Sequence, residues 1–149
     1  MNRRRQFLAV TGAMLVLGVI PAAHAQRALL AVTVYKSPTC GCCGDWVTHM
    51  RDNGFKVETH DLTDLAPIRR KWGVPDELTS CHTAQVGGYT IEGHVPAADI
   101  KRLLRERPKA RGLAVPGMVP GSPGMEQGTA QPYSTILFGG GSYRVFERH

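Results

Sequence analysis

Four cysteines carry the chemistry that this sequence can perform. Three of them fall within four consecutive positions, in the CxCC run Cys40-Gly41-Cys42-Cys43, and the fourth, Cys81, stands alone. Deprotonated cysteine sulfur is a soft metal ligand, and it is also the nucleophile of thiol–disulfide exchange. The sequence therefore predicts metal binding or sulfur redox chemistry at these positions.

A strand and a helix are expected to hold the CxCC run between them. The apolar, β-branched run 29–35 is typical of a central strand and ends shortly before the cysteines. Apolar side chains then recur at helical spacing, at Cys43, Trp46, Val47 and Met50. Asn53 and Gly54 predict the end of that helix, and residues 55–60 alternate as a second strand.

Cys40 and Cys43 form a C-x-x-C pair at this strand-to-helix junction. The N-terminus of a helix offers unpaired N–H groups and the positive end of the helix dipole, and both favour a thiolate over a thiol. We expect Cys40 to be the more exposed sulfur. Cys43 shares the apolar helix face with Trp46 and Val47, so we expect it to be the more buried one.

The rest of the sequence predicts a helix, a hairpin, a further helix, a long loop and a second hairpin. Asp64 is expected to cap the first of these helices and Gly73 to end it, and Pro96 opens the second. The segment 112–132 is rich in Gly and Pro, so it is expected to be an irregular surface loop and not a helix or a central strand. The hairpin strands are predicted at 83–86 with 89–92, and at 135–138 with 143–146.

This order of elements predicts an α/β domain with a thioredoxin-like fold. Its mixed central sheet would be flanked by helices, with the long Gly/Pro/Met loop as an addition. Cys81 precedes the first hairpin, so in this fold it approaches the C-x-x-C pair from across the end of the sheet. No repeat or linker divides the sequence, and residues 26–149 are therefore expected to form a single domain.

Residues 1–25 have the features of an export signal. Three arginines precede the apolar run 7–20, and the small residues Ala23 and Ala25 suit cleavage after Ala25. The order Arg-Arg-Gln-Phe-Leu at 4–8 resembles a twin-arginine signal, which exports folded proteins. The apolar run is too short for a transmembrane helix, so no membrane span is expected in the mature chain.

The charge of the chain does not indicate a nucleic-acid partner. The formal net charge is +6, from 18 Lys and Arg against 12 Asp and Glu. Three of these basic residues lie in the export signal, and the others are mixed with acidic residues on the predicted helix faces. We therefore predict no binding to nucleic acid.

Composition and spacing leave several kinds of cysteine chemistry open. In an exported protein an even number of cysteines suggests disulfides, and the easiest of the three possible pairings is Cys40–Cys43 with Cys42–Cys81. A metal site would instead need the four sulfurs to converge. Zinc is less suited, because Cys81 has no cysteine nearby to complete a second ligand pair. An iron–sulfur cluster is a more distant alternative.

Five longer motifs stand in order along the chain. They are KSPTCGCC at 36–43, TSCHT at 79–83, EGHVPA at 92–97, GLAVPGM at 112–118 and GSPGME at 121–126. Together they resemble the periplasmic copper-resistance proteins of the CopG type, once catalogued as a domain of unknown function. The resemblance runs from Tyr35 to about Phe146, and it implies a periplasmic, thioredoxin-like protein that handles copper through its cysteines.

The resemblance implies that copper is bound by Cys40, Cys42, Cys43 and Cys81. Cu(I) suits these residues on independent grounds, because it prefers thiolate and thioether sulfur and accepts bridging thiolates. Adjacent Cys42 and Cys43 cannot comfortably join the other two sulfurs around one tetrahedral ion. We therefore predict more than one Cu(I) ion.

Four other residues are candidate ligands. Met118 and Met125 lie in a loop that has little core to offer them, so their thioethers are predicted as copper ligands or as a route for copper to the site. His94 belongs to one of the family motifs. His82 directly follows Cys81, so its side chain is expected to point away from it, as a ligand or as a donor to one. The remaining histidines of the mature chain are expected in solvent: His49, His60 and His149.

Two functions follow from these residues. The first is an exported protein that holds Cu(I) in a cysteine-thiolate site for copper resistance or homeostasis, exchanging copper with other periplasmic copper-handling proteins. The second is an oxidoreductase that couples the Cys40/Cys43 dithiol to copper reduction or to disulfide exchange, with Cys40 as the attacking thiolate. We predict the first and keep the second as the alternative.

Overall fold

The computed structural model describes residues 30–149, so the predicted export signal lies outside the described residues. Along this part of the chain the elements are β1 (Leu30–Lys36), α1 (Gly41–Asp52), β2 (Phe55–Asp61), α2 (Ala66–Trp72), the 3₁₀ turn η1 (Asp76–Leu78), β3 (His82–Val86), β4 (Tyr89–Glu92), α3 (Ala97–Glu106), β5 (Gly112–Ala114), β6 (Ser134–Phe138) and β7 (Arg144–Arg148). Among these residues no helix is long and apolar enough to cross a membrane.

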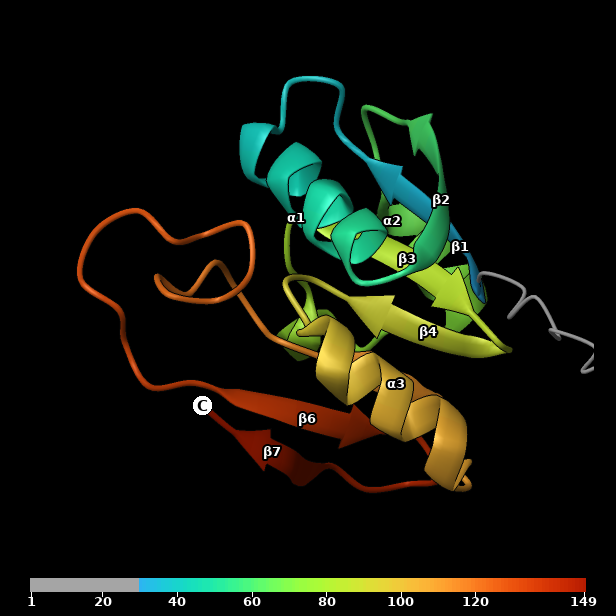
Figure 1. Cartoon of the computed structure of the whole chain (residues 1–149). Helices are drawn as coiled ribbons and strands as arrows, with labels where there is room; N and C mark the ends of the chain where they lie inside the picture. The colour runs from blue at the N-terminus through green and yellow to red at the C-terminus, as the bar shows by residue number, and fades with distance from the viewer. Residues whose placement is uncertain (1–29) are drawn as a thin grey trace, which may run out of the picture.

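The seven strands form one mixed sheet in the order β2-β1-β3-β4-β5-β6-β7 (Figure 1). β1 pairs with β2 and β4 pairs with β5 in parallel, and the other neighbours are antiparallel. The predicted α/β class, with a mixed sheet flanked by helices and a long Gly/Pro/Met loop, is confirmed. The strand–helix–strand unit followed by a helix, a hairpin and a helix is consistent with a thioredoxin-like fold.

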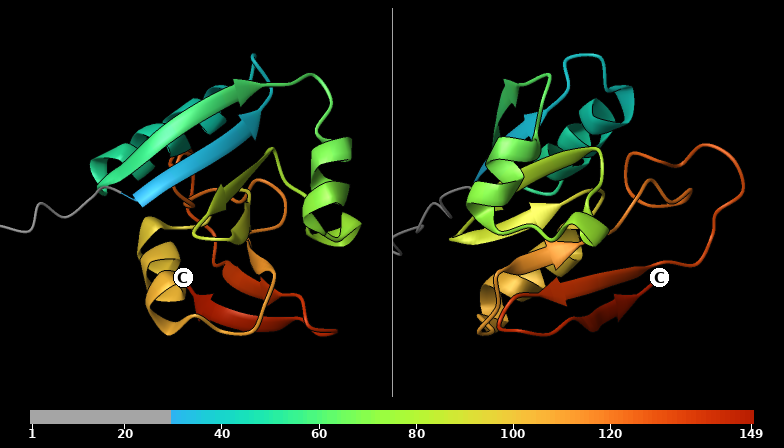
Figure 2. Two further views of the ribbon diagram at one scale, coloured as in Figure 1. Left: turned by 90° about the vertical axis from the view of Figure 1, so that its right-hand side faces the viewer. Right: turned by 180° about the vertical axis from the view of Figure 1, so that it is seen from behind.

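The sheet has a hydrophobic core on each face, and the helices that cover the two faces can be followed in Figure 2. α1 and α3 cover one face, where Trp46, Met50 and Ile100 are fully buried against strand residues such as Val34. The smaller core lies on the other face, on the side of α2, around Val74, Leu78, Ala114 and Phe138. Alternation along the strands explains this division, because successive side chains of a strand point to opposite faces.

The strand register brings the CxCC run and the Cys81 turn to the same end of the sheet. Lys36, the last residue of β1, pairs with His82, the first residue of β3. Next in the sheet, Thr83 of β3 pairs with Glu92, the last residue of β4. The chain runs from the end of β1 toward Cys40, and it enters the start of β3 from Cys81. Both cysteines therefore lie near the same end of the sheet.

One expectation about the Gly/Pro-rich segment is wrong. Gly112–Ala114 is a central strand, β5, hydrogen-bonded to β4 on one side and to β6 on the other. Glycine is needed at its start, because a Cβ on Gly112 would lie 1.7 Å from the carbonyl oxygen of Thr90. The irregular loop begins after this strand, and Figure 1 shows it projecting away from the sheet.

The boundaries of the second helix agree with the sequence. A side-chain oxygen of Asp64 accepts a hydrogen bond from the backbone N–H of Ala66 (2.9 Å), as a capping residue does. Gly73 ends α2 in the left-handed conformation, with φ of 69°. Gly73 therefore ends the helix as predicted, whereas Leu65 occupies the N-cap position and Asp64 accepts the Ala66 hydrogen bond from one residue before it.

Two histidines expected in solvent have structural roles instead. His49 on α1 is half-buried, and its Nε2 accepts a hydrogen bond from the backbone N–H of Ala97 (3.1 Å), the first residue of α3. His149 lies 2.9 Å, through Nε2, from a carboxylate oxygen of buried Asp99. Helical spacing alone does not show that another helix packs against His49. His60 keeps a side chain that is 41% exposed, as expected.

Candidate metal centre

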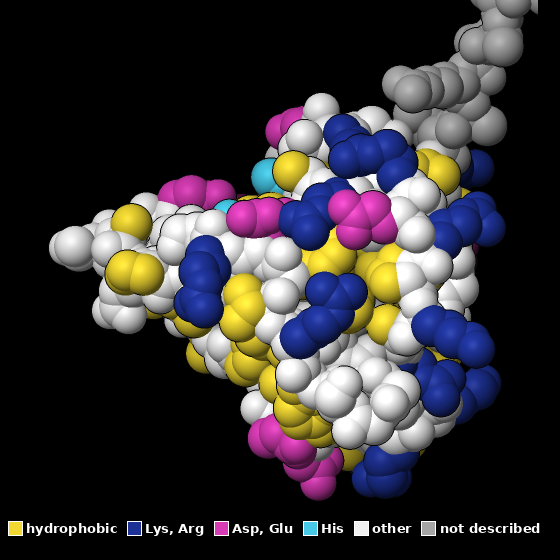
Figure 3. Space-filling view, turned by 90° about the horizontal axis from the view of Figure 1, so that it is seen from below, with side chains coloured by type: hydrophobic (Ala, Val, Ile, Leu, Met, Phe, Trp, Pro, Cys, Tyr) yellow, Lys and Arg dark blue, Asp and Glu magenta, His cyan; other side chains and the backbone are white. Residues whose placement is uncertain are grey.

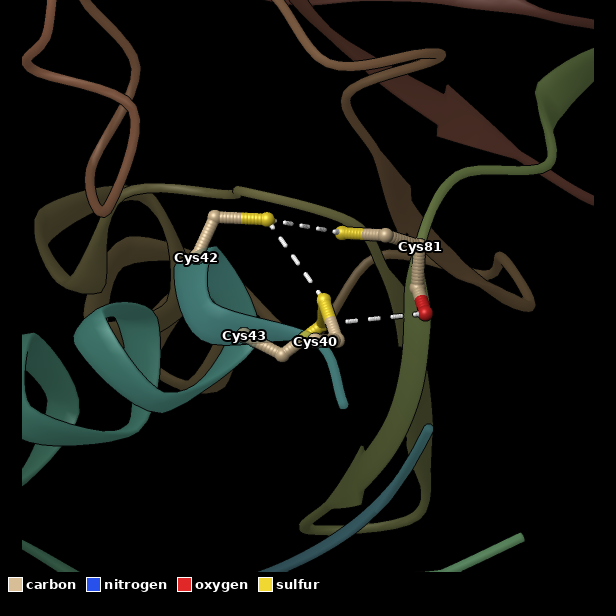
Figure 4. A group of neighbouring side chains, drawn as sticks. All are labelled: Cys40, Cys42, Cys43 and Cys81. Carbon is tan, nitrogen blue, oxygen red and sulfur yellow. Dashed lines mark hydrogen bonds between the residues drawn. A yellow bond between two sulfur atoms is a disulfide. The ribbon is translucent and has the colours of Figure 1, made fainter. Parts of the chain in front are cut away.

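The four cysteine sulfurs converge at the N-terminus of α1, as Figure 4 shows. All four Sγ atoms lie within 4.8 Å of one another. Cys42 is the middle of the group, because its Sγ lies 3.5 Å from that of Cys40 and 4.0 Å from that of Cys81. The predicted convergence of one short motif with a distant cysteine is thus present in the fold.

Cys40 and Cys43 are joined by a disulfide, and Cys42 and Cys81 are free thiols. The expected difference in exposure is confirmed, because Cys43 is fully buried while Cys40 is half-buried. This is one of the two bonds of the pairing that spacing favoured. Reduction of this single bond yields four thiols in one cluster.

Helix α1 explains why three sulfurs share one place. Cys40 is the N-cap residue, in an extended conformation, and Cys42 and Cys43 lie in the first helical turn. No acidic side chain occupies that turn. The free N–H groups and the helix dipole therefore favour negative charge on these sulfurs without competition from a carboxylate.

His94 contacts Cys81 directly. Its Nε2 lies 2.8 Å from the Cys81 Sγ, and its Nδ1 lies 2.8 Å from the carbonyl oxygen of Pro123. A carbonyl only accepts, so Nδ1 carries the proton and donates, which leaves Nε2 as an acceptor facing the sulfur. Burial lowers the pKa of His94, in agreement with a neutral ring.

Cys81 is a thiol in this arrangement. Burial, followed by the neighbouring Cys42, raises its pKa to about 12. The thiol proton is therefore available for the hydrogen bond to His94 Nε2. A metal ion that binds Cys81 must displace this proton, which couples binding to pH.

His82 turns toward Cys81, which corrects the expectation that it points away. Its Nδ1 lies 3.4 Å from the Cys81 Sγ, and its fully buried ring packs 4.4 Å from the ring of Trp46. The reason is that His82 begins β3, where its side chain enters the core beneath α1. Burial, together with the charges of His94 and Arg69, holds its pKa well below the ordinary value. Its Nε2 has no hydrogen-bond partner among residues 30–149.

A largely buried ion pair holds the backbone next to Cys81, and no sequence motif predicts it. Glu92 Oε1 accepts hydrogen bonds from Arg69 Nε (2.9 Å) and from the backbone N–H of Ser80 (2.8 Å). Arg69 also donates to the carbonyl oxygen of Ser80. We call Arg69, Glu92 and Ser80 the Ser80 clamp. The only sequence signal for the Ser80 clamp is the charged residue Glu92 at the end of the predicted hairpin strand 89–92.

The Gly/Pro/Met loop packs against both sides of the cluster. The Ser80 hydroxyl donates to the carbonyl oxygen of Gly117, at the start of the loop. Farther along, a Cβ on Gly124 would lie 2.7 Å from the carbonyl oxygen of Cys42 and from the backbone nitrogen of Trp46. The loop backbone therefore lies directly on the first turns of α1, and only glycine fits there.

The two loop methionines are placed differently. Met125 is half-buried and follows Gly124, whose backbone lies on the first turns of α1. Met118 is 57% exposed, so its side chain faces solvent. The two methionines thus differ in burial, and only Met125 is next to a residue that packs on α1.

The donor atoms suit a soft metal ion. The sulfurs form one group, and Cys81, His82 and His94 form a second group that shares Cys81 with the first. Neither group contains a carboxylate. Thiolate and imidazole ligands without carboxylates favour Cu(I) or Zn²⁺ over Mg²⁺ and Ca²⁺.

Comparisons with known proteins point to copper. A family model described as a protein of unknown function, DUF411, matches residues 78–125. The chain is similar to a solved structure of copper resistance protein CopG, Form 2, at 44% identity and a TM-score of 0.77, over 80% of this chain and 98% of that one. Form 1 gives 44% identity and a TM-score of 0.76, over 80% and 97%. No curated protein matches.

Proposed function

This chain belongs to the family of copper resistance protein CopG, and from that premise we propose that it holds Cu(I) in a multinuclear cysteine-thiolate site. A copper-related function follows from the family and from the cysteine cluster. The proposal adds the oxidation state, the ligands and the presence of more than one ion. Copper is the cargo of this protein, held for resistance or homeostasis.

The position of Cys42 carries the proposal. Its sulfur lies between those of Cys40 and Cys81, at 3.5 Å and 4.0 Å. Cys42 and Cys43 are adjacent in the helix, so their sulfurs leave the backbone in different directions and suit different ions. A central thiolate that bridges two Cu(I) ions would satisfy this geometry, because Cu(I) accepts low coordination numbers and shared sulfur.

Three further side chains are proposed as additional ligands. His94 offers an unprotonated Nε2 that already faces Cys81, and the carbonyl oxygen of Pro123 holds its ring in place. His82 is the next candidate, because it is neutral, buried and close to the same sulfur. Met125 is the proposed thioether ligand, because it directly follows Gly124, whose backbone lies on α1. Met118, which faces solvent, is better suited to receive or pass on copper at the surface.

The test is an anaerobic Cu(I) titration of the reduced protein against a competing Cu(I) chelator. Two or more tightly held ions per chain are expected. Cys42→Ser and Cys81→Ser should each lose at least one of these ions, whereas His60→Gln, a change at an exposed histidine, should bind as the parent does. A single ion that survives in both serine variants would refute the multinuclear site.

We also propose that residues 26–149 act in the periplasm after export. The support is the twin-arginine-like order at 4–8 followed by an apolar run. Other periplasmic copper-handling proteins would then supply or remove the copper. Replacing Arg4 and Arg5 with Lys should keep the protein in the cytoplasm if the twin-arginine route is used, and cell fractionation measures this.

A thiol oxidoreductase is the second candidate function, and the Cys40–Cys43 disulfide favours it. A thiolate of a partner would attack the half-buried Cys40 sulfur and release Cys43 as a thiolate. A second partner thiolate would then free Cys40, so two electrons pass from the partner to this pair. Disulfide exchange that survives in Cys42→Ser and Cys81→Ser, with weak Cu(I) binding in the parent, would favour this function over the first.

A further inference from the structure

A pocket lies at the end of the sheet opposite the metal centre. The metal centre is found where β4 and β5 end, whereas this pocket lies where β5 begins and β6 ends, at the paired residues Gly112 and Phe138. Its volume is about 560 Å³. The walls come from the end of α2 and from the tip of the β6–β7 hairpin, with Gly73, Arg111, Phe138, Gly139–Gly141 and Tyr143 among the lining residues.

Arg111 supplies the pocket with a cation that no acidic side chain neutralises. The residue is exposed, and its guanidinium forms no ion pair or side-chain hydrogen bond with any of residues 30–149. The side chain lies along Gly73, where an added Cβ would be only 3.2 Å from Arg111 Nε. The glycine that ends α2 therefore also makes room for the guanidinium.

The hairpin tip adds unpaired backbone donors beside this cation. The N–H groups of Gly139–Gly141 donate no backbone hydrogen bond within residues 30–149. Gly139 has to be glycine, because a Cβ there would lie 2.4 Å from the backbone nitrogen of Arg111. Gly140 and Gly141 have φ of 72° and 88°, which favour glycine even though an added Cβ would clash with nothing. Successive free N–H groups in such a turn are suited to an anion.

Basic residues flank the pocket lining in the sequence. Exposed Lys109 lies two residues before Arg111, and exposed Arg144 directly follows Tyr143. Two exposed acids, Asp76 and Glu77, follow the lining residue Pro75, and Glu77 accepts a hydrogen bond from the Tyr143 hydroxyl (2.6 Å). The space-filling view from below shows Lys and Arg side chains gathered toward the right-hand edge, the side on which α3 ends (Figure 3). This charge raises the local concentration of anions.

We propose that this pocket binds a small oxyanion, of the carboxylate or phosphate class. The guanidinium of Arg111 and the N–H groups of Gly139–Gly141 are the proposed donors, and Phe138, whose ring belongs to the smaller core, anchors the start of this glycine run. Arginine offers a planar pair of N–H donors that matches two oxygens of either group. The site is separate from the cysteine cluster, so the proposal does not depend on copper.

The test is a ¹⁵N NMR titration of the isolated protein with inorganic phosphate and, separately, with succinate. Saturable shifts are expected at the Gly139–Gly141 amides and at Arg111 Nε, and the anion that produces them identifies the class. Arg111→Gln should weaken binding about ten-fold, because a charge-assisted pair of hydrogen bonds is lost. Lys109→Gln removes the same charge outside the pocket and should change binding by less than about two-fold.

Two results would overturn the proposal. One is the absence of saturable shifts at these amides with both anions in the parent protein, a readout that needs no variant to fold. The other is equal weakening by Arg111→Gln and Lys109→Gln, which would indicate a general effect of charge. Cu(I) binding should be the same in both variants and in the parent.

Discussion

The two sides of the metal centre are built in different ways. On the helix side, Cys40, Cys42 and Cys43 occupy one helical turn and are neighbours in the sequence. On the sheet side, Cys81 and His94 are held by contacts between distant segments: the β1–β3 register, the Ser80 clamp and the carbonyl oxygen of Pro123. Changes far from any sulfur should therefore disturb the sheet side and leave the helix side intact.

The largest effect is expected at Gly93, which lies between the Ser80 clamp and His94. Its φ is 70°, and a Cβ there would lie 2.5 Å from Ser80 Cβ and from the carbonyl oxygen of Val115. Gly93→Ala should lower the free energy of unfolding by about 3 kcal/mol or more, because it adds a clash to the strain of a left-handed alanine. Urea denaturation measures the change.

Gly88→Ala is the matched control for this substitution. Gly88 has φ of 87°, and nothing lies within 4 Å of an added Cβ. Strain alone should then cost about 1–2 kcal/mol. Equal losses in the two variants would show that crowding around Ser80 does not hold the sheet side.

A smaller loss is expected from breaking the Ser80 clamp at Glu92. Glu92→Ala leaves half-buried Arg69 without its carboxylate partner and the N–H of Ser80 without its acceptor, and should destabilise the protein by about 2–4 kcal/mol. Glu92→Gln keeps an oxygen in place and should cost less. Alkylation should become faster at Cys81 in the alanine variant and stay unchanged at Cys42. Faster alkylation of both thiols alike would contradict a clamp that acts on one side only.

His94→Gln should change the sheet side without disturbing the fold. The ring nitrogen that faces the Cys81 thiol is lost, so Cu(I) affinity at this side should fall about ten-fold. Competition with a Cu(I) chelator measures the affinity, and an unchanged urea midpoint excludes a folding defect. The same ten-fold loss in His60→Gln would show that the effect does not arise from contact with Cys81.

The smallest effect is expected at the far end of the helix side, where His49 joins α1 to α3. Burial lowers its pKa from 6.5, against weaker opposing effects of Glu126 and Asp52. The unfolded chain therefore binds a proton as the pH falls below 6.5 while the folded chain resists it, so stability is full above 6.5 and decreases toward the folded pKa.

His49→Gln keeps an acceptor for the Ala97 N–H and removes this titration. Its free energy of unfolding should decrease less than that of the parent between pH 7 and about pH 5. Chemical denaturation at a series of pH values measures the difference. Parallel curves would mean that His49 does not contribute to the acid sensitivity.

The sequence predicted the helices and strands more accurately than the contacts between them. Strand propensity and helical spacing located β1 and α1, and Asp64 and Gly73 marked both ends of α2. The strand β5 was missed, because three residues that begin with glycine carry no strand pattern and their pairing depends on β4 and β6. The orientation of His82 was missed for a similar reason, since the ring of Trp46 that covers it is distant in sequence.

Some properties of this protein are determined by the sequence itself. Three sulfurs must share the N-terminus of a helix, because the CxCC spacing spans one helical turn after a strand. The preference of the site for soft metal ions follows from the same cysteines.

Only the tertiary structure decided the other half of the centre. It brings Cys81 within 4.0 Å of Cys42, turns His94 Nε2 toward that thiol and buries the Glu92–Arg69 pair beside it. These distances depend on strand register and on side chains from segments far apart in the chain. The expected fold predicted that Cys81 approaches the CxCC run, but local sequence patterns do not specify these contacts, because each arises from packing that the whole fold selects.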